Sequence, residues 1–274
     1  MPKYVNCSLC GLNRTQIIQE AEEPFKVVKC RNCGLVYTNP QPERGLIEEH
    51  YQEEYYREWM EKQMEKRIPM WKKRLKEITQ YKNKGHLLDV GCGIGTFLKL
   101  AKEEGFGISG TEISEYASRY VKENLRIDVL RGDIEELDFP PESFDVLTMW
   151  HTLEHLPNPK AALKEINRIL KREGLLVIAT PNLNNFITRV LYFLAKGKKL
   201  KLFSDRAKEL HLYHFSIHTL ASMLKETGFR IIKIDMDLAQ LAFPKKILDY
   251  LTFIVHAITR KNFGEAIKIY AVKA

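Results

Sequence analysis

From residue 85 onward, short apolar segments of strand length alternate with segments that have a helical pattern. In the helical segments, apolar residues recur every three or four positions, and Gly105 and Gly228 follow the ends of two of them. Such alternation predicts a mostly parallel, doubly wound α/β sheet of seven strands with helices on both faces, because parallel strands need crossover connections that pack back on the sheet. The expected strands are His86–Val90, Gly107–Glu112, Ile127–Leu130, Phe144–Trp150, Leu175–Thr180, Phe229–Ile234 and Ala266–Val272.

A glycine-rich turn joins the first expected strand to the helix that follows it. It reads DVGCGIG over residues 89–95. Ligands of doubly wound sheets bind at the carboxyl ends of the strands, and glycine lets the backbone approach a ligand that a Cβ would keep away. By itself the turn also fits a tight strand-to-helix connection without a ligand.

Two acidic residues follow the next two expected strands. Glu112 lies 21 positions after Gly91 at the end of the second strand, where a carboxylate can accept both hydroxyls of a ribose. Asp133 follows the third strand and could face an adenine amino group. Either acid alone fits a solvated surface charge, but the order of turn and acids favours a nucleotide-like ligand.

The segments LDVGCGIGTFL, GTEIS and GDIEELDFPPESFDVLTMWHTLEHL together resemble the class I S-adenosylmethionine-dependent methyltransferases, over roughly residues 85–235. The resemblance implies a Rossmann-like sheet that ends in an antiparallel hairpin, and methyl transfer from S-adenosylmethionine. It places the glycine turn at the methionine part of the cofactor, Glu112 on the ribose and Asp133 at the adenine. A nicotinamide dehydrogenase is disfavoured because its third glycine would fall at Thr96. The cofactor-binding residues implied are Asp89, Gly91, Cys92, Gly93, Gly95, Glu112, Ile113, Asp133, Ile134 and Trp150.

Histidines near the expected mouth of the site are candidate bases, because a hydroxyl acceptor must lose a proton when it is methylated. His151 follows the fourth strand, and His211 and His214 lie in HLYHFS, which resembles a segment of the same family near the acceptor pocket. A structural role is the alternative for each, and we expect it for His155. The Asn/Asp-Pro-Pro-aromatic motif of amino-group methyltransferases is absent, which favours oxygen or carbon methylation of a small molecule such as a sugar, a quinone precursor or a lipid-linked intermediate.

Four of the five cysteines form two C-x-x-C pairs. Cys7 and Cys10 are separated from Cys30 and Cys33 by 19 residues, a spacing typical of zinc sites. Four thiolates leave no open coordination position, so we expect a structural zinc ion. The segment CRNCGLVYTNPQP resembles a ribbon that precedes many bacterial small-molecule methyltransferases. The fifth cysteine, Cys92, is expected to be a small buried residue rather than a nucleophile.

These patterns divide the chain into three parts: a zinc ribbon at 1–44, a helical linker at 45–84 and the methyltransferase domain at 85–274. The linker has an apolar face typical of packing against the main domain, and a helix break is expected at Pro69. Two apolar and basic stretches do not fit the alternation, and they predict helical insertions near 185–215 and 237–262.

The formal net charge of +8 permits an anionic partner without requiring one. An RNA methyltransferase is therefore the alternative function, although no RNA-binding module is recognisable. Residues 186–201 could contact a membrane surface, while a lid over the acceptor is the more ordinary interpretation. A cytoplasmic protein is expected, because the sequence starts without an apolar leader and has no apolar run near the roughly 20 residues that span a bilayer.

Overall fold

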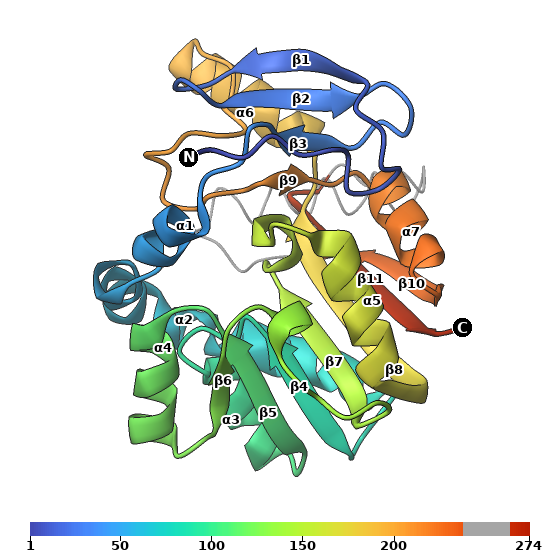
Figure 1. Cartoon of the computed structure of the whole chain (residues 1–274). Coiled ribbons are helices and arrows are strands. Elements are labelled where there is room, and N and C mark those ends of the chain that lie inside the picture. The colour runs from blue at the N-terminus through green and yellow to red at the C-terminus, as the bar shows by residue number, and fades with distance from the viewer. Residues whose placement is uncertain (238–263) are drawn as a thin grey trace.

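The computed structural model of the chain describes residues 1–237 and 264–274, which form two sheets with helices around the larger one (Figure 1). The larger sheet has seven strands in the order β10-β11-β8-β7-β4-β5-β6. Its strands from β8 to β6 pair in parallel, whereas β11 runs antiparallel to both β8 and β10. The predicted fold class is thereby confirmed. The strands are β4 (His86–Val90), β5 (Gly107–Glu112), β6 (Val129–Arg131), β7 (Phe144–Trp150), β8 (Leu170–Pro181), β10 (Phe229–Met236) and β11 (Ala266–Lys273).

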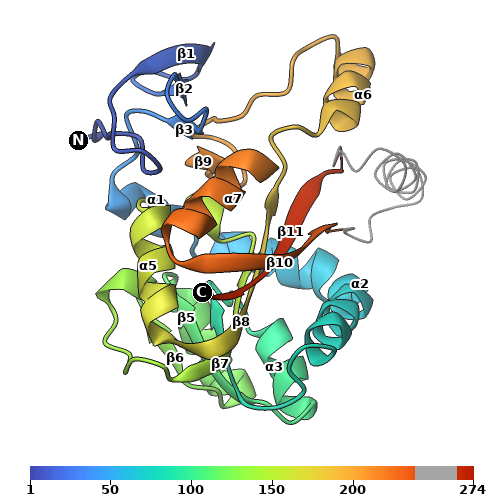
Figure 2. The same cartoon turned by 90° about the vertical axis from the view of Figure 1, so that its right-hand side faces the viewer.

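Both faces of the large sheet are buried under helices. Successive residues of a strand point to opposite faces, so Leu87 packs in one apolar core and Leu88 in the other. Figure 2 shows α2 and α3 on one side of the sheet and α5 and α7 on the other. The helices are α2 (Glu53–Thr79), α3 (Thr96–Glu103), α4 (Glu115–Tyr120), α5 (Pro159–Ile169) and α7 (Ile217–Glu226).

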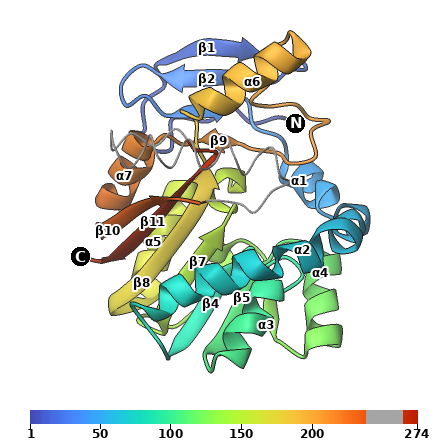
Figure 3. The same ribbon diagram turned by 180° about the vertical axis from the view of Figure 1, so that it is seen from behind.

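Helix α2 continues through Pro69, so the expected break at this residue is wrong. Proline removes one backbone hydrogen bond, but the turns that follow bury Met70, Leu75 and Ile78. This face lies across the sheet next to α3 (Figure 3). Tertiary packing therefore maintains the helix through a residue that would end an isolated one.

The second sheet has four antiparallel strands in the order β1-β2-β3-β9. Its last strand comes from far along the chain, within the region where a helical insertion was expected. A helix, α6 (Phe186–Lys196), does occupy the first part of that region, but residues 213–214 are extended. The second expected insertion, 237–262, lies almost entirely outside the described residues. The strands are β1 (Thr15–Glu20), β2 (Lys26–Cys30), β3 (Val36–Thr38) and β9 (Tyr213–His214).

Strand β9 joins the cysteine-containing segment to the rest of the protein. Tyr213 pairs with Tyr37, and their rings stack with centroids 5.9 Å apart. The Tyr213 hydroxyl accepts a hydrogen bond from Gln41 Nε2 (3.1 Å) and donates to the carbonyl of Pro157 (3.1 Å). After β3 the chain enters the short helix α1 (Arg44–His50) and then α2. The division of residues 1–84 into a zinc ribbon (1–44) and a helical linker (45–84) stays a prediction.

None of the helices in the described part of the chain is long and apolar enough to span a bilayer.

Candidate active site

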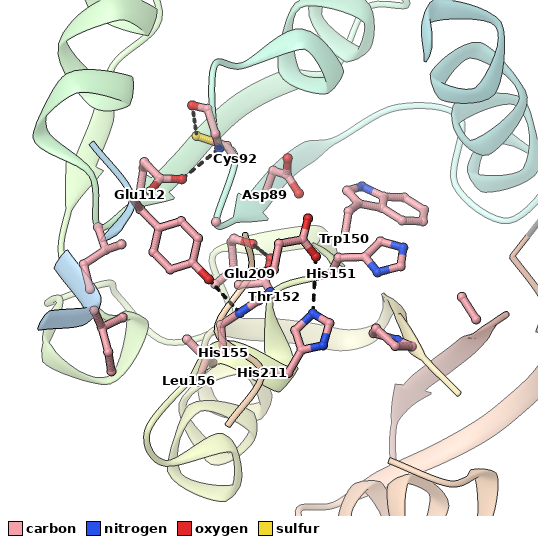
Figure 4. Close-up of a pocket in the computed structure, with 18 of the residues that line it drawn as sticks. Asp89, Cys92, Glu112, Trp150, His151, Thr152, His155, Leu156, Glu209 and His211 are labelled. Carbon is pink, nitrogen blue, oxygen red and sulfur yellow. Dashed lines mark hydrogen bonds and ion pairs between the residues drawn. The ribbon is translucent and has the colours of Figure 1, made fainter. Parts of the chain in front are cut away.

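A cavity of about 640 Å³ lies at the carboxyl ends of the parallel strands. The glycine turn after β4 forms one wall, and residues after β5, β6 and β7 form the floor (Figure 4). The opposite side is lined by residues from the chain after β8 and from the segment that contains β9. They are Pro181, Asn182, Leu183, Asn185, Arg189, Leu200, Lys201, Leu202, Glu209, His211 and His214. Nine of the ten residues predicted to bind the cofactor line this cavity, and the tenth, Gly95, ends the same turn.

The three glycines of the turn have left-handed backbone conformations, with φ of +72° at Gly91, +55° at Gly93 and +73° at Gly95. A Cβ at Gly91 would come within 2.6 Å of the Thr152 side chain. A Cβ on Gly93 would meet nothing closer than the Tyr56 ring, at 3.5 Å. The turn therefore needs glycine for its shape, and its middle leaves open backbone on the cavity side, as a bound cofactor requires.

Glu112 holds the turn in place. Its carboxylate accepts hydrogen bonds from the backbone N–H groups of Gly93 (2.8 Å) and Ser114 (2.9 Å). Burial raises its pKa, while these hydrogen bonds and one from Tyr56 act in the opposite direction. Each carboxylate oxygen has a second lone pair, so Glu112 can still accept from ribose hydroxyls.

Two further acids complete this end of the cavity. Asp89 is buried and accepts a hydrogen bond from Thr148 Oγ1 (2.6 Å), and its burial raises its pKa to about 7. Asp133 is nearly buried, 3.5 Å from Arg44 Nη2, and burial raises its pKa as well. The three acids place carboxyl groups at this end of the cavity, and a cofactor with a sulfonium charge would favour their ionised forms. Cys92 is buried beside them, as expected, and burial raises its pKa well above the usual range.

Helix α2, which was expected to be part of a linker, supplies residues of the cavity. The guanidinium of Arg74 lies against the rings of both Trp71 and Trp150, at 4.6 and 4.4 Å from their centroids. The same guanidinium donates to the buried carboxylate of Asp237 (Nε to Oδ1, 3.2 Å). Sequence reasoning missed Arg74 as a residue of the site. The signal that could have found it is an arginine inside an otherwise apolar helical face, because a buried arginine needs a carboxylate partner. Other cavity residues missed in this way are Tyr51, Tyr55, Tyr56, Arg67 and Trp71.

Two of the three candidate bases have protonation states that make proton abstraction difficult. Burial lowers the pKa of His151, but hydrogen bonds with Asp237 and Glu154 outweigh it and raise the pKa to about 9. His151 is therefore already protonated at neutral pH. His214 is buried, and this burial together with the charges of His211 and Arg189 lowers its pKa to about 3. It is a neutral and weakly basic imidazole.

His211 has a different environment. Its Nε2 lies 3.3 Å from Oε2 of Glu209 (Figure 4). The hydrogen bond with His211 lowers the pKa of Glu209 to about 2, so this carboxylate is ionised throughout the physiological range. The neighbouring His155 is fixed by its Nδ1, which lies 2.8 Å from the carbonyl of Leu210 and 2.9 Å from the Tyr51 hydroxyl. His155 also lines the cavity, and its structural role stays a prediction.

The four paired cysteines meet at one point of the smaller sheet. The sulfur atoms of Cys7 and Cys33 are 3.4 Å apart, those of Cys10 and Cys30 are 3.6 Å apart, and all four lie within 4.8 Å of one another. A zinc ion bound tetrahedrally at about 2.3 Å from each sulfur requires sulfur–sulfur distances of about 3.8 Å. Each pair lies on a tight turn, closed by the N–H groups of Gly11 and Gly34. The donor set therefore fits a structural zinc ion.

A glycine turn after β4, acids after β5 and β6, and an antiparallel β11 in a seven-stranded sheet define a class I S-adenosylmethionine-dependent methyltransferase. The family described as a methyltransferase domain matches residues 56–234, and the chain belongs to this family. The predicted resemblance and the predicted enzyme class are thereby confirmed. The matched region begins inside α2, in agreement with the contribution of this helix to the cavity.

Several known proteins are similar to the chain. An uncharacterised protein of Methanocaldococcus jannaschii is 29% identical over 65% of this chain and 80% of its own length. A ubiquinone biosynthesis O-methyltransferase of Coxiella burnetii is 31% identical, and the match spans 54% of this chain but only 65% of that enzyme. The putative methyltransferase in complex with the Trm112 methyltransferase activator of Haloferax volcanii has a TM-score of 0.57 and 17% identity, over 78% of this chain and 93% of that chain. This last likeness concerns the fold.

Replacing Glu112 tests the cofactor end of the cavity. We expect Glu112→Gln to weaken the binding of S-adenosylhomocysteine by roughly 10- to 100-fold, because charge-assisted hydrogen bonds are lost. Isothermal titration measures the affinity, and Glu115→Gln is the matched control, since Glu115 is an exposed acid on α4. Equal affinities of the two variants would show that Glu112 does not contact the cofactor.

Metal analysis tests the cysteine site. We expect about one zinc ion per chain in the purified protein, and far less in Cys10→Ser, because a thiolate ligand is lost. Cys92→Ser is the control, since Cys92 lies in the glycine turn, and it should retain the metal. Wild-type protein that folds without any bound metal would contradict the assignment.

Proposed function

We propose that this methyltransferase uses S-adenosylmethionine to methylate an oxygen of a small-molecule acceptor, with His211 as the base. The observation that carries the proposal is the His211–Glu209 pair, which lies on the wall of the same cavity as the glycine turn. The name of the Coxiella burnetii relative, a ubiquinone biosynthesis O-methyltransferase, supports oxygen as the acceptor atom and a quinone precursor as one candidate substrate. A sugar or a lipid-linked intermediate also fits a cavity of this kind, and carbon methylation is the competing chemistry.

The residues of the chain contribute mainly by orientation. S-adenosylmethionine supplies an electrophilic methyl group when it is bound. The turn at Gly91–Gly95, with Glu112 and Asp133, would hold the cofactor. The aromatic side chains of Tyr51, Tyr55, Tyr56 and Trp71 would exclude water. Alignment of reacting atoms in such a site can contribute roughly 7–11 kcal/mol to catalysis.

His211 would remove the proton of the acceptor hydroxyl. The ionised Glu209 orients the imidazole and stabilises the imidazolium that forms. His151 cannot share this role at neutral pH, because it holds its proton between Glu154 and Asp237. A positive charge beside the acceptor would instead lower the pKa of a nearby hydroxyl.

Removing the base should impair turnover and leave cofactor binding intact. We expect His211→Gln to lower kcat by roughly 10²- to 10⁴-fold on an acceptor found by screening catechols, hydroxybenzoates and sugars. Its affinity for S-adenosylhomocysteine should be unchanged. His218→Gln is the control, because His218 is an exposed histidine on α7.

Two results would contradict the proposal. Undiminished turnover by His211→Gln would show that His211 is not the base. Methylation of RNA in place of every small molecule, with binding that weakens steeply as salt rises, would support the RNA alternative.

The exposed side of α6 supports a peripheral contact with an anionic membrane. Val190, Leu191, Phe193 and Leu194 expose large apolar side chains, and Leu194 is 72% exposed. Exposed lysines follow at 196, 198 and 199, and α6 projects from the body of the protein (Figure 2). Apolar side chains next to lysines suit the interface of an anionic bilayer. Such a contact would bring a lipid-linked acceptor to the cavity, because Arg189 of the same helix lines it.

Liposome flotation tests this surface. We expect the protein to float with phosphatidylglycerol vesicles and not with phosphatidylcholine vesicles. The double variant Phe193→Ser/Leu194→Ser should bind at least several-fold more weakly, because about 25 cal/mol is lost per Å² of apolar area left unburied. Leu130→Ser is the control, as Leu130 is an exposed apolar residue on β6. If the wild-type protein floats with neither kind of vesicle, the proposed membrane contact is contradicted.

A further inference from the structure

The cationic side chains of the cavity wall are balanced by carboxylates, with one exception. Arg67 lies in the field of Glu209, which acts to raise its pKa. Most of the other cationic side chains that line the cavity have a carboxylate oxygen within 4 Å of a nitrogen atom. These pairs are Arg44 with Glu136, Arg74 with Asp237, His151 with Glu154, Lys201 with Glu22, and His211 with Glu209.

Arg189 is the exception. Its Nε is buried and has no hydrogen-bond partner, and within the described ranges no carboxylate lies within ion-pair distance of its guanidinium. Burial lowers its pKa, and no neighbouring acid acts in the opposite direction. An arginine keeps its charge even so, because its pKa starts above 12. A half-buried charge without a partner is costly, and a bound anion would remove this cost.

Other unpartnered polar groups lie on the same wall. Asn185 Oδ1 and His214 Nε2 are buried without hydrogen-bond partners, and both residues line the cavity. They come together because the chain after β8 runs beside β9: the N–H of Leu183 donates to the carbonyl of Phe215 (2.8 Å). An amide and a neutral imidazole can each present an N–H to a ligand oxygen, since the amide orientation and the tautomer adapt to the ligand.

We propose that Arg189, together with Asn185 and His214, binds an anionic group of the methyl acceptor, so that the enzyme acts on acidic substrates. This inference rests on the proposed function, because it places the acceptor in the cavity next to His211. One guanidinium and two neutral groups balance a single negative charge, which favours a carboxylate over a dianionic phosphate. The neutral state of His214 fits this balance, because it adds no second positive charge.

Matched ligands with and without the charge test the subsite. Protein saturated with S-adenosylhomocysteine is titrated with 3,4-dihydroxybenzoate, with the neutral 3,4-dihydroxybenzamide and with phenyl phosphate. We expect the wild-type protein to bind the carboxylate on the order of 10- to 100-fold more tightly than the carboxamide, as for a hydrogen-bonded charge. In Arg189→Gln this preference should disappear, and in Arg189→Lys part of it should remain.

A matched control distinguishes this subsite from a general effect of the protein's positive charge. Arg172→Gln removes the same charge at an exposed position near the opposite end of β8, and it should keep the preference. Equal binding of carboxylate and carboxamide by the wild-type protein, no detectable carboxylate binding, or a preference that survives in Arg189→Gln would each overturn the inference. Tighter binding of phenyl phosphate than of the carboxylate would also overturn it. The same holds if Arg189→Gln weakens binding to phosphatidylglycerol vesicles but leaves binding of the soluble carboxylate unchanged. If S-adenosylhomocysteine itself does not bind, the proposed function fails instead, so the two failures are distinguishable.

Discussion

The pairing of β9 with β3 is the contact on which the acceptor side of this protein depends. Only two residues, Tyr213 and His214, extend the cysteine-bound sheet, and they lie between the chain that carries His211 and the start of α7. The ring of Tyr213 stacks on Tyr37, and its hydroxyl links Gln41 to Pro157. The four-cysteine segment therefore supports one wall of the site through β9, although none of residues 1–43 lines the cavity. A metal that stiffens β1–β3 would also fix the position of His211 and His214.

Charge divides the cavity into two ends. Asp89, Glu112 and Asp133 place carboxyl groups at the end with the glycine turn, and a bound sulfonium would favour their ionised forms. The other end holds histidines and the guanidinium of Arg189, which has no carboxylate partner among the residues that the structure describes. Opposite charges at the two ends would orient an anionic acceptor toward the methyl donor, because each ligand is attracted to one end and repelled from the other. Our two proposals thus describe a single electrostatic arrangement.

Helix α2 shows how tertiary packing changes the meaning of a sequence pattern. Its apolar positions predicted a linker helix against the main domain, and Leu75 and Ile78 do pack there. The same helix places Arg74 against two tryptophans and against Asp237, which lies more than 160 positions away in the sequence. Periodicity identifies a buried face but not the residue that faces it. The role of Arg74 therefore could not be predicted from the helix alone.

The sequence by itself determined the parallel α/β sheet, the glycine turn, the acids after β5 and β6, and the four-cysteine cluster. These features depend on local patterns: strand and helix periods, glycines at positive φ, and the spacing within a C-x-x-C pair. The tertiary structure was needed to show that Pro69 stays inside a helix, that residues 213–214 form a strand, and that Asp237 lies beside His151. Those properties arise from contacts between distant segments, such as Tyr37 with Tyr213 and His151 with Asp237. Burial and charge at such contacts depend on which segments meet, and the local sequence carries no record of that.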